Sequence, residues 1–471
     1  MPVTKEQMLE WCRTLLHVNP AAPKHTLAEY LATIPRLSAL ADVPAGTPVL
    51  VRGDVDAKPG ARIGEGDQRL RSMVETLRFG IDRGWKQVIF GHIGRKPDGS
   101  LKDVARRIGE LISQDVPLIN DWWDEGAKTI PARISETIAG AKSGSVLVLE
   151  NTRRYAIERV LWDATPDDLP RLAPDLAQFA NECAAKIAKA YVNEALSAGS
   201  LDSSSTIVPA AMERVALGSY VAAEFDGPMR RCLDAQLVIF SGLKIDKLDD
   251  LQAMIDRGTI RWVFVAGSLS MALRKAAAEL EVRQFSLGKA ENPAHAKEPW
   301  FIPPDRIEQA RRMISEGRAK GIQFVLPVDS ILQNGRASDT IGPDDQQFDV
   351  GPKTSELFER KIGEFLESVR GSLGTAKPPV AFHNGVFGMF EDARFEEGTR
   401  RFIPQLKRLK DTGVEVYVGG GEGGKALEKH GDESWVTHVF TAGGTVLNAL
   451  GSFPVPYLQA LAMAARRSGV R

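Results

Sequence analysis

Short apolar segments alternate with amphipathic segments along almost the whole chain of 471 residues. The apolar segments are rich in Val, Ile, Leu and Phe and are uninterrupted by polar residues, as expected of strands that are buried on both faces. Strands that alternate with helices predict parallel sheets with crossover helices. Ten such strands are expected, at residues 48–55, 87–92, 145–150, 190–193, 236–242, 262–267, 323–328, 379–385, 414–419 and 437–441. Amphipathic helices are expected between them, for example at residues 69–85, 101–114, 304–320 and 355–370.

The chain is longer than one hydrophobic core usually organises, so two domains are expected. A helix predicted at residues 216–233 divides the chain into halves of similar length. It would join an N-terminal α/β domain (1–215), which begins with a helical extension, to a C-terminal α/β domain (234–453) that is followed by a tail (454–471). The expected fold class is α/β, with two Rossmann-like domains joined by the inter-domain helix and a hinge.

Charge and cysteine content restrict the class of protein. Lys and Arg total 60 and Asp and Glu total 61, whereas proteins that bind nucleic acids or membrane surfaces usually have a basic excess. We therefore expect no nucleic-acid partner and no membrane partner. The three cysteines, Cys12, Cys183 and Cys232, are too scattered for a disulfide framework or a zinc site. With no signal peptide evident and no window apolar enough to span a bilayer, we expect a cytoplasmic protein.

Basic residues follow three of the predicted strands in the first half of the chain. The first strand runs into RGDVD (residues 52–56), and DQR (67–69) follows a glycine-rich loop. Two later strands run into GHIGR (91–95) and ENTRR (150–154). The carboxyl ends of parallel strands gather at one edge, and guanidinium groups bind carboxylate and phosphate. These residues indicate an anionic substrate, although each arginine alone is equally typical of a solvated loop.

Glycines follow the strands in the second half. GGGEGG (residues 419–424) and AGG (442–444) both precede predicted helices, where unobstructed backbone N–H groups bind phosphate. A third strand is followed by Lys244 and Lys247, which would share one face of a helix beginning there. The alternative is two solvated lysines at a helix start. The stretch at 419–426 also approaches the dinucleotide and P-loop patterns, but Ala426 stands where a P-loop needs Ser or Thr, and no acidic residue ends the next strand.

Ten segments between about residue 45 and residue 453 resemble, in order, signatures of the phosphoglycerate kinase family. They are VLVRGD (49–54), DQR (67–69), HIGR (92–95), LENTR (149–153), YVNEA (191–195), LPVD (326–329), DVGPKT (349–354), NGVFGMFE (384–391), GGGEGG (419–424) and TAGG (441–444). The resemblance implies the phosphoglycerate kinase fold, in which the N-terminal domain binds the acid and the C-terminal domain binds the nucleotide. It also implies ATP-dependent phosphoryl transfer to a carboxylate, a monomer, and a tail that packs back on the N-terminal domain.

The resemblance also implies roles for individual residues. The acid site would be lined by Asp54, Asp56, Arg69, His92, Arg95 and Arg153. The nucleotide site would contain Lys247, Asn384, Glu391, Gly420, Gly421, Glu422 and Gly423. The transferred phosphoryl group would lie among Arg69, Lys244, Gly443 and Gly444. Mg²⁺, with Glu422 as its protein ligand, would bridge the oxygens of the co-substrate ATP.

The chemistry agrees with these residue types. A carboxylate has an ordinary pKa of about 4, so it is already ionised at neutral pH and needs no general base. Phosphoryl transfer depends mainly on alignment and charge neutralisation, which cations and glycine amides supply. Closure at the hinge would bring acid and nucleotide into line.

The sequence departs from the family at both sites. The family has a basic His-Arg-Ala-His stretch where this chain has SLDS (residues 200–203), so one arginine and two histidines are replaced and Asp202 is added. Asp56 stands for an asparagine, and Glu422 for an aspartate. Three hypotheses follow. The protein phosphorylates an acid other than 3-phosphoglycerate, it is a divergent phosphoglycerate kinase, or it is a nucleotide-binding regulatory homologue without catalysis.

Overall fold

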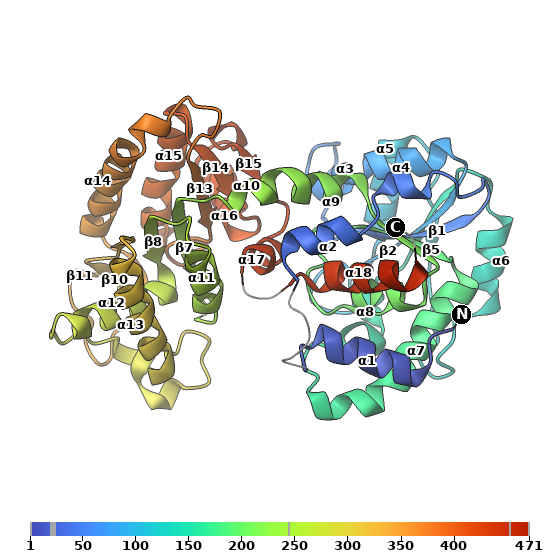
Figure 1. The fold of residues 1–471 in the computed structure, drawn as a ribbon, viewed down its shortest axis with the longest axis horizontal. Coiled ribbons are helices and arrows are strands. Elements are labelled where there is room, and N and C mark those ends of the chain that lie inside the picture. Colours follow the sequence, from blue (N-terminus) through green and yellow to red (C-terminus); the bar gives the residue numbers. More distant parts are fainter. Residues whose placement is uncertain (1, 19–24, 244, 452–453, 470–471) are drawn as a thin grey trace. The chain divides into compact units, whose positions relative to one another are not determined.

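The chain folds into two compact units, each built on its own parallel sheet (Figure 1). The computed structural model describes residues 2–18, 25–243, 245–451 and 454–469. Unit 1 comprises residues 1–226 and 454–471, and unit 2 comprises residues 227–453. The predicted α/β class with two parallel sheets is confirmed, and all ten predicted strands are found.

Unit 1 has a six-stranded sheet in the order β3-β4-β2-β1-β5-β6, and each neighbouring pair is parallel. Its strands are β1 (Pro48–Gly53), β2 (Lys86–Phe90), β3 (Leu118–Ile119), β4 (Val146–Leu149), β5 (Ala190–Glu194) and β6 (Arg214–Leu217). The central strands are buried along their length, which explains their continuous apolar sequences. Strands β3 and β6 are short and lie at the two edges, and the sequence analysis did not predict them.

The helices of unit 1 connect these strands and cover the sheet. They are α1 (Lys5–Leu15), α2 (Leu27–Thr33), α3 (Gln68–Ser72), α4 (Val74–Asp82), α5 (Lys102–Ile112), α6 (Ala132–Gly140), α7 (Leu169–Lys186), α8 (Ser203–Thr206), α9 (Ser219–Glu224) and α18 (Pro456–Ser468). Capping boxes at Thr4 with Gln7 and at Thr26 with Glu29 fix where α1 and α2 begin. Helix α18, from the end of the chain, lies beside α2 and α8 (Figure 1).

The helix predicted at residues 216–233 begins later than expected. Ala216 and Leu217 are the last residues of β6, where they pair with β5, and the helix starts at Ser219. The chain then runs through α9, a π-helical turn (Phe225–Met229) and α10 (Arg230–Cys232). Pro228 lies inside the π turn and lacks the N–H that a regular α-helix would use there. The apolar residues of β6 were taken for the start of the helix because they precede it with only Gly218 between.

Unit 2 has a second parallel sheet and a small antiparallel one. The parallel sheet has the order β15-β14-β13-β7-β8-β9, formed by β7 (Leu237–Gly242), β8 (Trp262–Ala266), β9 (Gln323–Val325), β13 (Val380–Asn384), β14 (Glu415–Val418) and β15 (His438–Val439). The antiparallel sheet has the order β11-β10-β12, formed by β10 (Ser330–Leu332), β11 (Ala337–Ser338) and β12 (Gln347–Val350). The antiparallel sheet was not predicted, since its strands are short and polar.

The helices of unit 2 pack around an aromatic core. They are α10, α11 (Lys247–Asp256), α12 (Gly267–Leu280), α13 (Pro304–Ala319), α14 (Pro352–Ser368), α15 (Glu397–Asp411), α16 (Glu422–His430) and α17 (Gly444–Leu450). Phe264 of β8 contacts Phe358 of α14 and Phe402 of α15 through edge-on or tilted rings, which joins both helices to the sheet.

The three cysteines lie in the interior of the protein. Cys12, Cys183 and Cys232 are all buried, and none of the three forms a disulfide. Burial raises the pKa of the Cys12 thiol to about 12, so it stays protonated. In the described part of the chain, no helix combines the length and the apolar character needed to cross a membrane.

A buried carboxylate holds the start of α14. Asp329 accepts hydrogen bonds from the Thr354 N–H at 2.8 Å, the Thr354 hydroxyl at 2.6 Å and the Lys353 N–H at 3.1 Å. These N–H groups belong to the first helical turn, where no intrahelical acceptor exists. Asp329 is buried, so water cannot replace it.

We expect Asp329→Ala to lower the free energy of unfolding by about 2–3 kcal/mol, since it removes a helix cap and leaves buried donors unpaired. Urea unfolding followed by circular dichroism measures the change. Asp432→Ala, which removes an exposed cap from the Ser434 N–H in the same unit, should leave the midpoint nearly unchanged. Equal effects of the two substitutions would contradict this account.

Candidate active site

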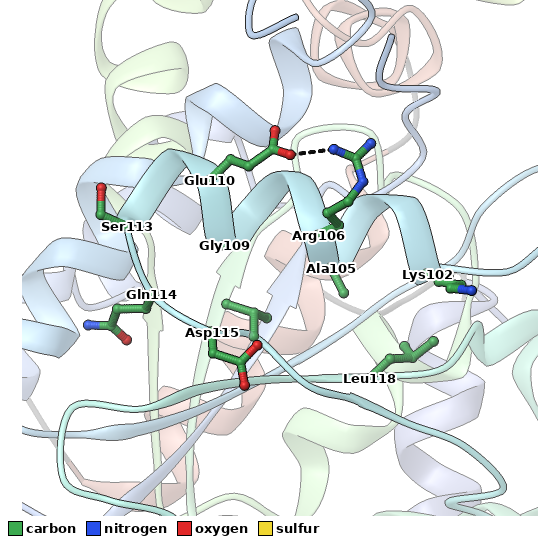
Figure 2. A pocket seen from close by; sticks show the side chains of 10 residues that line it. Lys102, Ala105, Arg106, Gly109, Glu110, Ser113, Gln114, Asp115 and Leu118 are labelled. Atoms are coloured by element: carbon green, nitrogen blue, oxygen red, sulfur yellow. Dashed lines mark hydrogen bonds and ion pairs between the residues drawn. The ribbon is translucent and has the colours of Figure 1, made fainter. Parts of the chain in front are cut away.

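One hollow on unit 1 lies away from the place where the predicted residues gather. It has a volume of about 610 Å³ and lies between α5 and the turn that leads into β3 (Figure 2). Its lining includes an ion pair between Arg106 and Glu110 (Figure 2). The lining contains none of the residues that the sequence analysis selected.

The predicted acid-site residues follow β1, β2 and β4, which are adjacent in the sheet of unit 1 together with β5. Strand β1 leads to Asp54 and Asp56, β2 leads to His92 and Arg95, and β4 leads to Arg153. The register aligns Arg52 of β1 with Phe90 of β2, and Gly53 with Glu194 of β5, so these strands end at the same level. Parallel strands thus bring loops that are distant in sequence to one edge.

Arg69, Asp54 and Asp56 form one group at this edge. The Arg69 Nη1 lies 3.4 Å from Asp56 Oδ2, 3.7 Å from Asp54 Oδ1 and 3.2 Å from the Asp56 carbonyl oxygen. Asp54 is buried and accepts a hydrogen bond from the Ser197 hydroxyl at 2.7 Å. Asp56 accepts one from the Gly94 N–H at 2.8 Å, which joins the β1 and β2 loops. The Arg69 side chain remains partly exposed, so its guanidinium is held at the edge and is accessible to an anion.

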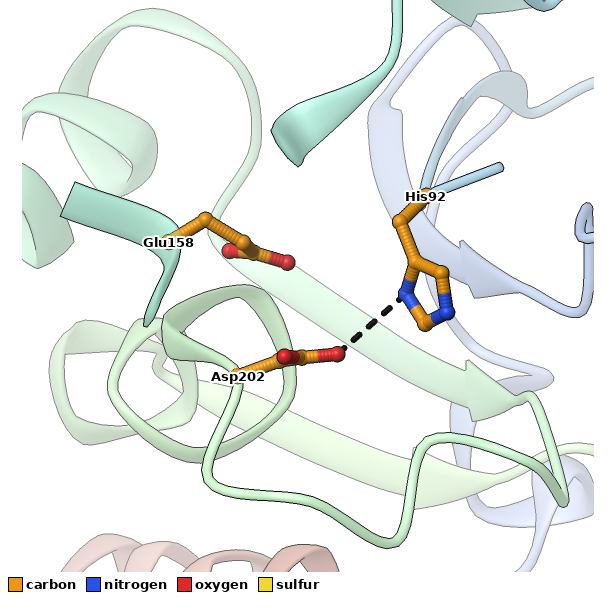
Figure 3. A group of neighbouring side chains, drawn as sticks. All are labelled: His92, Glu158 and Asp202. Atoms are coloured by element: carbon orange, nitrogen blue, oxygen red, sulfur yellow. Dashed lines mark ion pairs between the residues drawn. The ribbon is translucent and has the colours of Figure 1, made fainter. Parts of the chain in front are cut away.

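A second group surrounds Asp202, which is fully buried. Its Oδ2 lies 3.2 Å from Nδ1 of His92 and 3.7 Å from one guanidinium nitrogen each of Arg52 and Arg153 (His92 and Asp202 in Figure 3). The Arg52 guanidinium also lies 2.9 Å from His92 Nδ1. Asp202 therefore lies at the centre of the basic cluster. It belongs to SLDS (residues 200–203), the loop in which the sequence analysis found the family's basic residues replaced.

Glu158 and Ser204 are hydrogen-bonded to each other and, through Ser204, to Arg52 of this cluster. Glu158 belongs to the 3₁₀ turn Ala156–Arg159 and is buried. It accepts hydrogen bonds from the Ser204 N–H at 2.9 Å, the Ser204 hydroxyl at 2.6 Å and the Thr152 hydroxyl at 2.9 Å. The Ser204 hydroxyl in turn accepts a bond from Arg52 Nε at 3.0 Å. These contacts tie the β1, β4 and β5 loops together.

Trp162 lies at the exposed side of the cluster. Its indole N–H donates to Asp202 Oδ1 at 2.9 Å, and its ring lies 5.1 Å from the Arg153 guanidinium carbon and 5.4 Å from that of Arg159. The residue is 41% exposed, which is unusual for so large an apolar side chain that also makes a buried hydrogen bond. The ring thus forms a flat surface next to Arg153.

Burial and the neighbouring charges of the cluster shift the pKa values of His92, Asp202 and Glu158. Burial lowers the pKa of His92, and the nearby Arg52 adds to this effect against the opposing charge of Asp202, so the ring is neutral near pH 7. Burial opposes ionisation of Asp202, but His92, Arg52 and Arg153 outweigh it and lower the pKa of that carboxyl. Burial, together with the negative charge of Asp202, raises the pKa of Glu158 to about 7. One firm negative charge thus lies among two arginines.

His92, Glu158 and Asp202 converge (Figure 3), and within the described residues they are the group of His, Cys, Asp or Glu close enough to share a metal ion. Their ligand atoms lie within 4.8 Å of one another. However, Arg52 and Arg153 lie against the same Asp202 oxygen, and two positive charges there oppose a cation. The charges of the cluster therefore argue against a metal ion between these three residues.

In unit 2, glycines line the carboxyl ends of β7, β13 and β14. A Cβ on Gly385 would lie 2.2 Å from the Ser241 carbonyl oxygen, and one on Gly420 would lie 2.2 Å from that of Phe440. Neither position admits a side chain, so adjacent loops approach through bare backbone. Helix α16 starts at Glu422 and α17 at Gly444, which places Gly421 and Gly443 at their N-caps, as the sequence predicted.

The other predicted nucleotide-site residues lie around these loops. Lys247 is the first residue of α11, and its ammonium donates to the Ser241 carbonyl oxygen at 3.1 Å. Asn384 ends β13 and is buried, with its amide nitrogen 2.2 Å from where a Gly419 Cβ would be. Glu391 and Glu422 are exposed, and Gly423 is buried in the first turn of α16. Lys244 lies outside the described residues.

The sequence analysis noted Arg52 among the basic residues at the strand ends without giving it a role, and it selected neither Glu158 nor Trp162. Arg52 and Glu158 are buried partners of the Asp202 cluster, and Trp162 covers it. The position of Arg52 inside an apolar strand was a further signal, because a charge is buried there only with partners. Gly267, with φ of +65°, starts α12 beside Gly242 and extends the glycine edge. Arg95, in contrast, is exposed and contacts the cluster region only through its carbonyl oxygen, which accepts from Arg159.

These features define a class of protein: two α/β units, one with a basic and one with a glycine-lined strand edge, as in kinases of small molecules. The sequence model described as phosphoglycerate kinase matches residues 40–452, and the chain therefore belongs to the phosphoglycerate kinase family. Members of this family are ATP-dependent kinases that transfer phosphate to a carboxylate, and the prediction of this class of enzyme is confirmed.

Individual relatives are distant but cover most of the chain. A phosphoglycerate kinase of Dictyoglomus turgidum is 26% identical over 429 residues, which span 87% of this chain and 94% of that protein. The cytosolic phosphoglycerate kinase 3 of Arabidopsis thaliana is 26% identical over 413 residues, or 84% of this chain and 90% of that protein. The structure of phosphoglycerate kinase from Pyrococcus horikoshii matches with a TM-score of 0.66 and 24% identity, covering 92% of this chain and 100% of that one. The fold is therefore shared over nearly the full length.

Stability should depend on the ionisation of Glu158. Because its pKa is raised in the folded state from 4.5 to about 7, folding favours the protonated form. The contribution of Glu158 to the free energy of unfolding is then greatest below pH 4.5 and falls as the pH rises to about 7. Relative to Glu158→Gln, the unaltered protein should lose about 2–3 kcal/mol between pH 5 and pH 8, measured by urea unfolding. Glu136→Gln, at an exposed position of α6, serves as the control, and parallel curves for all three proteins would contradict the assignment.

The glycine edge should bind the nucleotide only while it stays bare. In Gly420→Ala the Cβ would meet the Phe440 carbonyl oxygen at 2.2 Å and the Ala442 nitrogen at 2.8 Å, so the loop must shift. We expect MgADP affinity to fall roughly tenfold or more, a change of about 1.4 kcal/mol, by titration calorimetry. Gly424→Ala is the matched control, since its Cβ would meet Val439 at an ordinary 3.4 Å. Equal affinities for the two variants would argue against a nucleotide at this edge.

Proposed function

We propose that this protein transfers the terminal phosphoryl group of ATP to the carboxylate of a small acid other than 3-phosphoglycerate, forming an acyl phosphate. The observation that carries the proposal is Asp202, a buried carboxylate that already occupies the basic cluster of Arg52, His92 and Arg153.

A phosphate-bearing tail would meet an unfavourable charge in this cluster. Two unit charges 4 Å apart interact by about 4 kcal/mol at the effective dielectric constant typical near a protein surface. The tail of 3-phosphoglycerate would experience this repulsion from Asp202, which also compensates one of the two guanidinium charges that would attract it. SLDS (residues 200–203) also supplies none of the three basic side chains that the resemblance implies for this loop.

The reacting carboxylate belongs at the other group. Arg69 is partly exposed at the edge and is held by Asp54 and Asp56, which fix its guanidinium without hiding it. A guanidinium in that position binds a carboxylate and directs one oxygen toward the phosphorus. The acid attacks in its ionised form, so the residues that act here orient and neutralise instead of removing a proton.

The nucleotide belongs at the glycine edge of unit 2. The first N–H groups of α16 and α17 suit the phosphates. Lys247 donates to the Ser241 carbonyl oxygen in β7, and Asn384 lies against Gly419, which follows β14. Glu422 is an exposed carboxylate at the start of α16, which fits a Mg²⁺ that keeps most of its water and is bound chiefly through phosphate oxygens. The ion would neutralise charge on the phosphates. The roles of Lys244, Gly443, Gly444 and Glu391 stay predictions.

The test is ADP release from MgATP with a panel of short carboxylic acids that includes 3-phosphoglycerate, with hydroxylamine present to trap acyl phosphates. Hydroxamate formed from an acid without phosphate, and little from 3-phosphoglycerate, is the expected result. Hydroxamate from 3-phosphoglycerate in preference to all others would show ordinary phosphoglycerate kinase activity. Nucleotide binding without turnover would leave the regulatory hypothesis.

Arg69→Ala should lower kcat/KM for the accepted acid at least a hundredfold, about 2.7 kcal/mol of transition-state stabilisation, because the carboxylate loses its orienting cation. The affinity for MgADP should not change. Arg78→Ala, on the exposed face of the neighbouring helix α4, provides a control with the same change of charge. Normal turnover by Arg69→Ala would overturn the placement of the acid.

A further inference from the structure

Two buried polar atoms in the Asp202 cluster have no hydrogen-bond partner among the described residues. They are Oδ2 of Asp202, an acceptor, and Nε of Arg153, a donor. The two side chains face one another, with Arg153 Nη2 3.7 Å from Asp202 Oδ2. Buried atoms of this kind are costly unless they find partners. One unpaired acceptor and one unpaired donor therefore lie together in the acid-binding unit.

The neighbouring contacts explain why Oδ2 lacks a donor. Nδ1 of His92 is the nearest nitrogen at 3.2 Å, but it also lies 2.9 Å from an Arg52 guanidinium nitrogen, which can only donate. A neutral ring that accepts from Arg52 at Nδ1 has no proton there for Asp202. The other oxygen, Oδ1, is occupied by the Trp162 indole N–H. Oδ2 is thus the free acceptor of this carboxylate.

The two orphan atoms select the group that completes the cluster. An ionised phosphate or carboxylate has no proton to donate to Asp202 Oδ2. An ammonium group or a metal ion has no acceptor for Arg153 Nε and is repelled by Arg52 and Arg153. A hydrocarbon tail would leave both orphan atoms unpaired, whereas a hydroxyl group is uncharged, donates one hydrogen bond and accepts others, so it can pair with both.

Trp162 adds a second, independent feature. Its ring is 41% exposed at the side of the cluster and lies against the Arg153 guanidinium. A flat apolar face beside hydrogen-bonding groups suits the C–H face of a short polyhydroxylated chain. The indole is also the exposed member of the cluster, so it is the group that a ligand meets before it reaches the buried atoms.

We propose that the acid substrate is an unphosphorylated hydroxy acid whose terminal hydroxyl donates to Asp202 and accepts from Arg153, with its carbon chain against Trp162. The inference rests on the proposed function, since it specifies the acid of that same site. Asp202 is then the residue that determines specificity, because it replaces recognition of a phosphate by recognition of a hydroxyl.

Binding of matched acids to the full-length protein tests this inference without requiring turnover. Glycerate and lactate differ only in the terminal hydroxyl, and sugar acids of four to six carbons are compared in the same way with their terminal deoxy analogues. Calorimetry should show at least a tenfold preference for the hydroxylated member of one or more pairs. Difference fluorescence against Trp162→Phe should show that the indole reports this binding.

Variants assign the preference to Asp202. In Asp202→Ala and in the isosteric Asp202→Asn, the preference should fall below about twofold, and 3-phosphoglycerate should bind more tightly than it does to the unaltered protein. Asp163→Ala, which removes an exposed carboxylate next to Trp162, should keep the preference. Thermal melting shows which variants fold. No preference in any pair, or a preference that persists in both Asp202 variants, overturns the inference, and the orphan atoms then hold water alone.

The two proposals fail separately. Hydroxyl-dependent binding without hydroxamate would refute carboxylate phosphorylation and leave the recognition by Asp202 intact. Hydroxamate from acids irrespective of a terminal hydroxyl would refute this inference and leave the kinase activity.

Discussion

Parallel strand order is the constraint on which both candidate sites depend. When every strand in a sheet runs in the same direction, each loop after a strand lies at the same edge, and the helix that follows begins there. Asp54, His92 and Arg153 follow three different strands and are far apart in sequence. They nevertheless lie at the same edge of the sheet, because β4, β2 and β1 are neighbours. The same rule places the glycines of unit 2 at the starts of α16 and α17. The difference between the two edges is one of residue type, basic in one and bare backbone in the other.

Asp202 shows how one substitution changes a site without changing the fold. A buried guanidinium needs a compensating anion, and in a phosphate-binding pocket the ligand can supply it. Here the protein supplies its own: Asp202 lies against Arg52, His92 and Arg153, with Glu158 and Ser204 supporting it. The cost of burying these charges is thus met before any ligand binds. Part of the attraction that an anionic tail could use is directed to Asp202 within the protein.

Much of the fold was predictable, and the failures have physical causes. Long apolar strands such as β1 and β7 carry a strong signal because both faces are buried. The edge strands β3 and β6 and the antiparallel sheet β10–β12 do not, since they are short or partly exposed. Strand β6 also runs directly into α9, so its apolar residues were read as helical. At the basic edge of unit 1, the loops after strands located Asp54, Arg69, His92 and Arg153, and Arg52 was noted there without a role. Glu158 and Trp162 lie in a segment without periodicity and were not selected.

The contact that no sequence pattern indicated is the one on which the proposed choice of acid depends. Asp202 was visible as a departure from the family, but a carboxylate in a loop is ordinarily exposed, and only the structure shows it buried between two arginines. Its Oδ1 is engaged by Trp162, whereas its Oδ2 is not engaged by any hydrogen bond within the described chain. Asp202 therefore does more than balance charge, because one of its two oxygens can still accept a hydrogen bond. Together with the orphan Nε of Arg153, this oxygen is the observation on which the proposed recognition of a neutral group by these arginines rests.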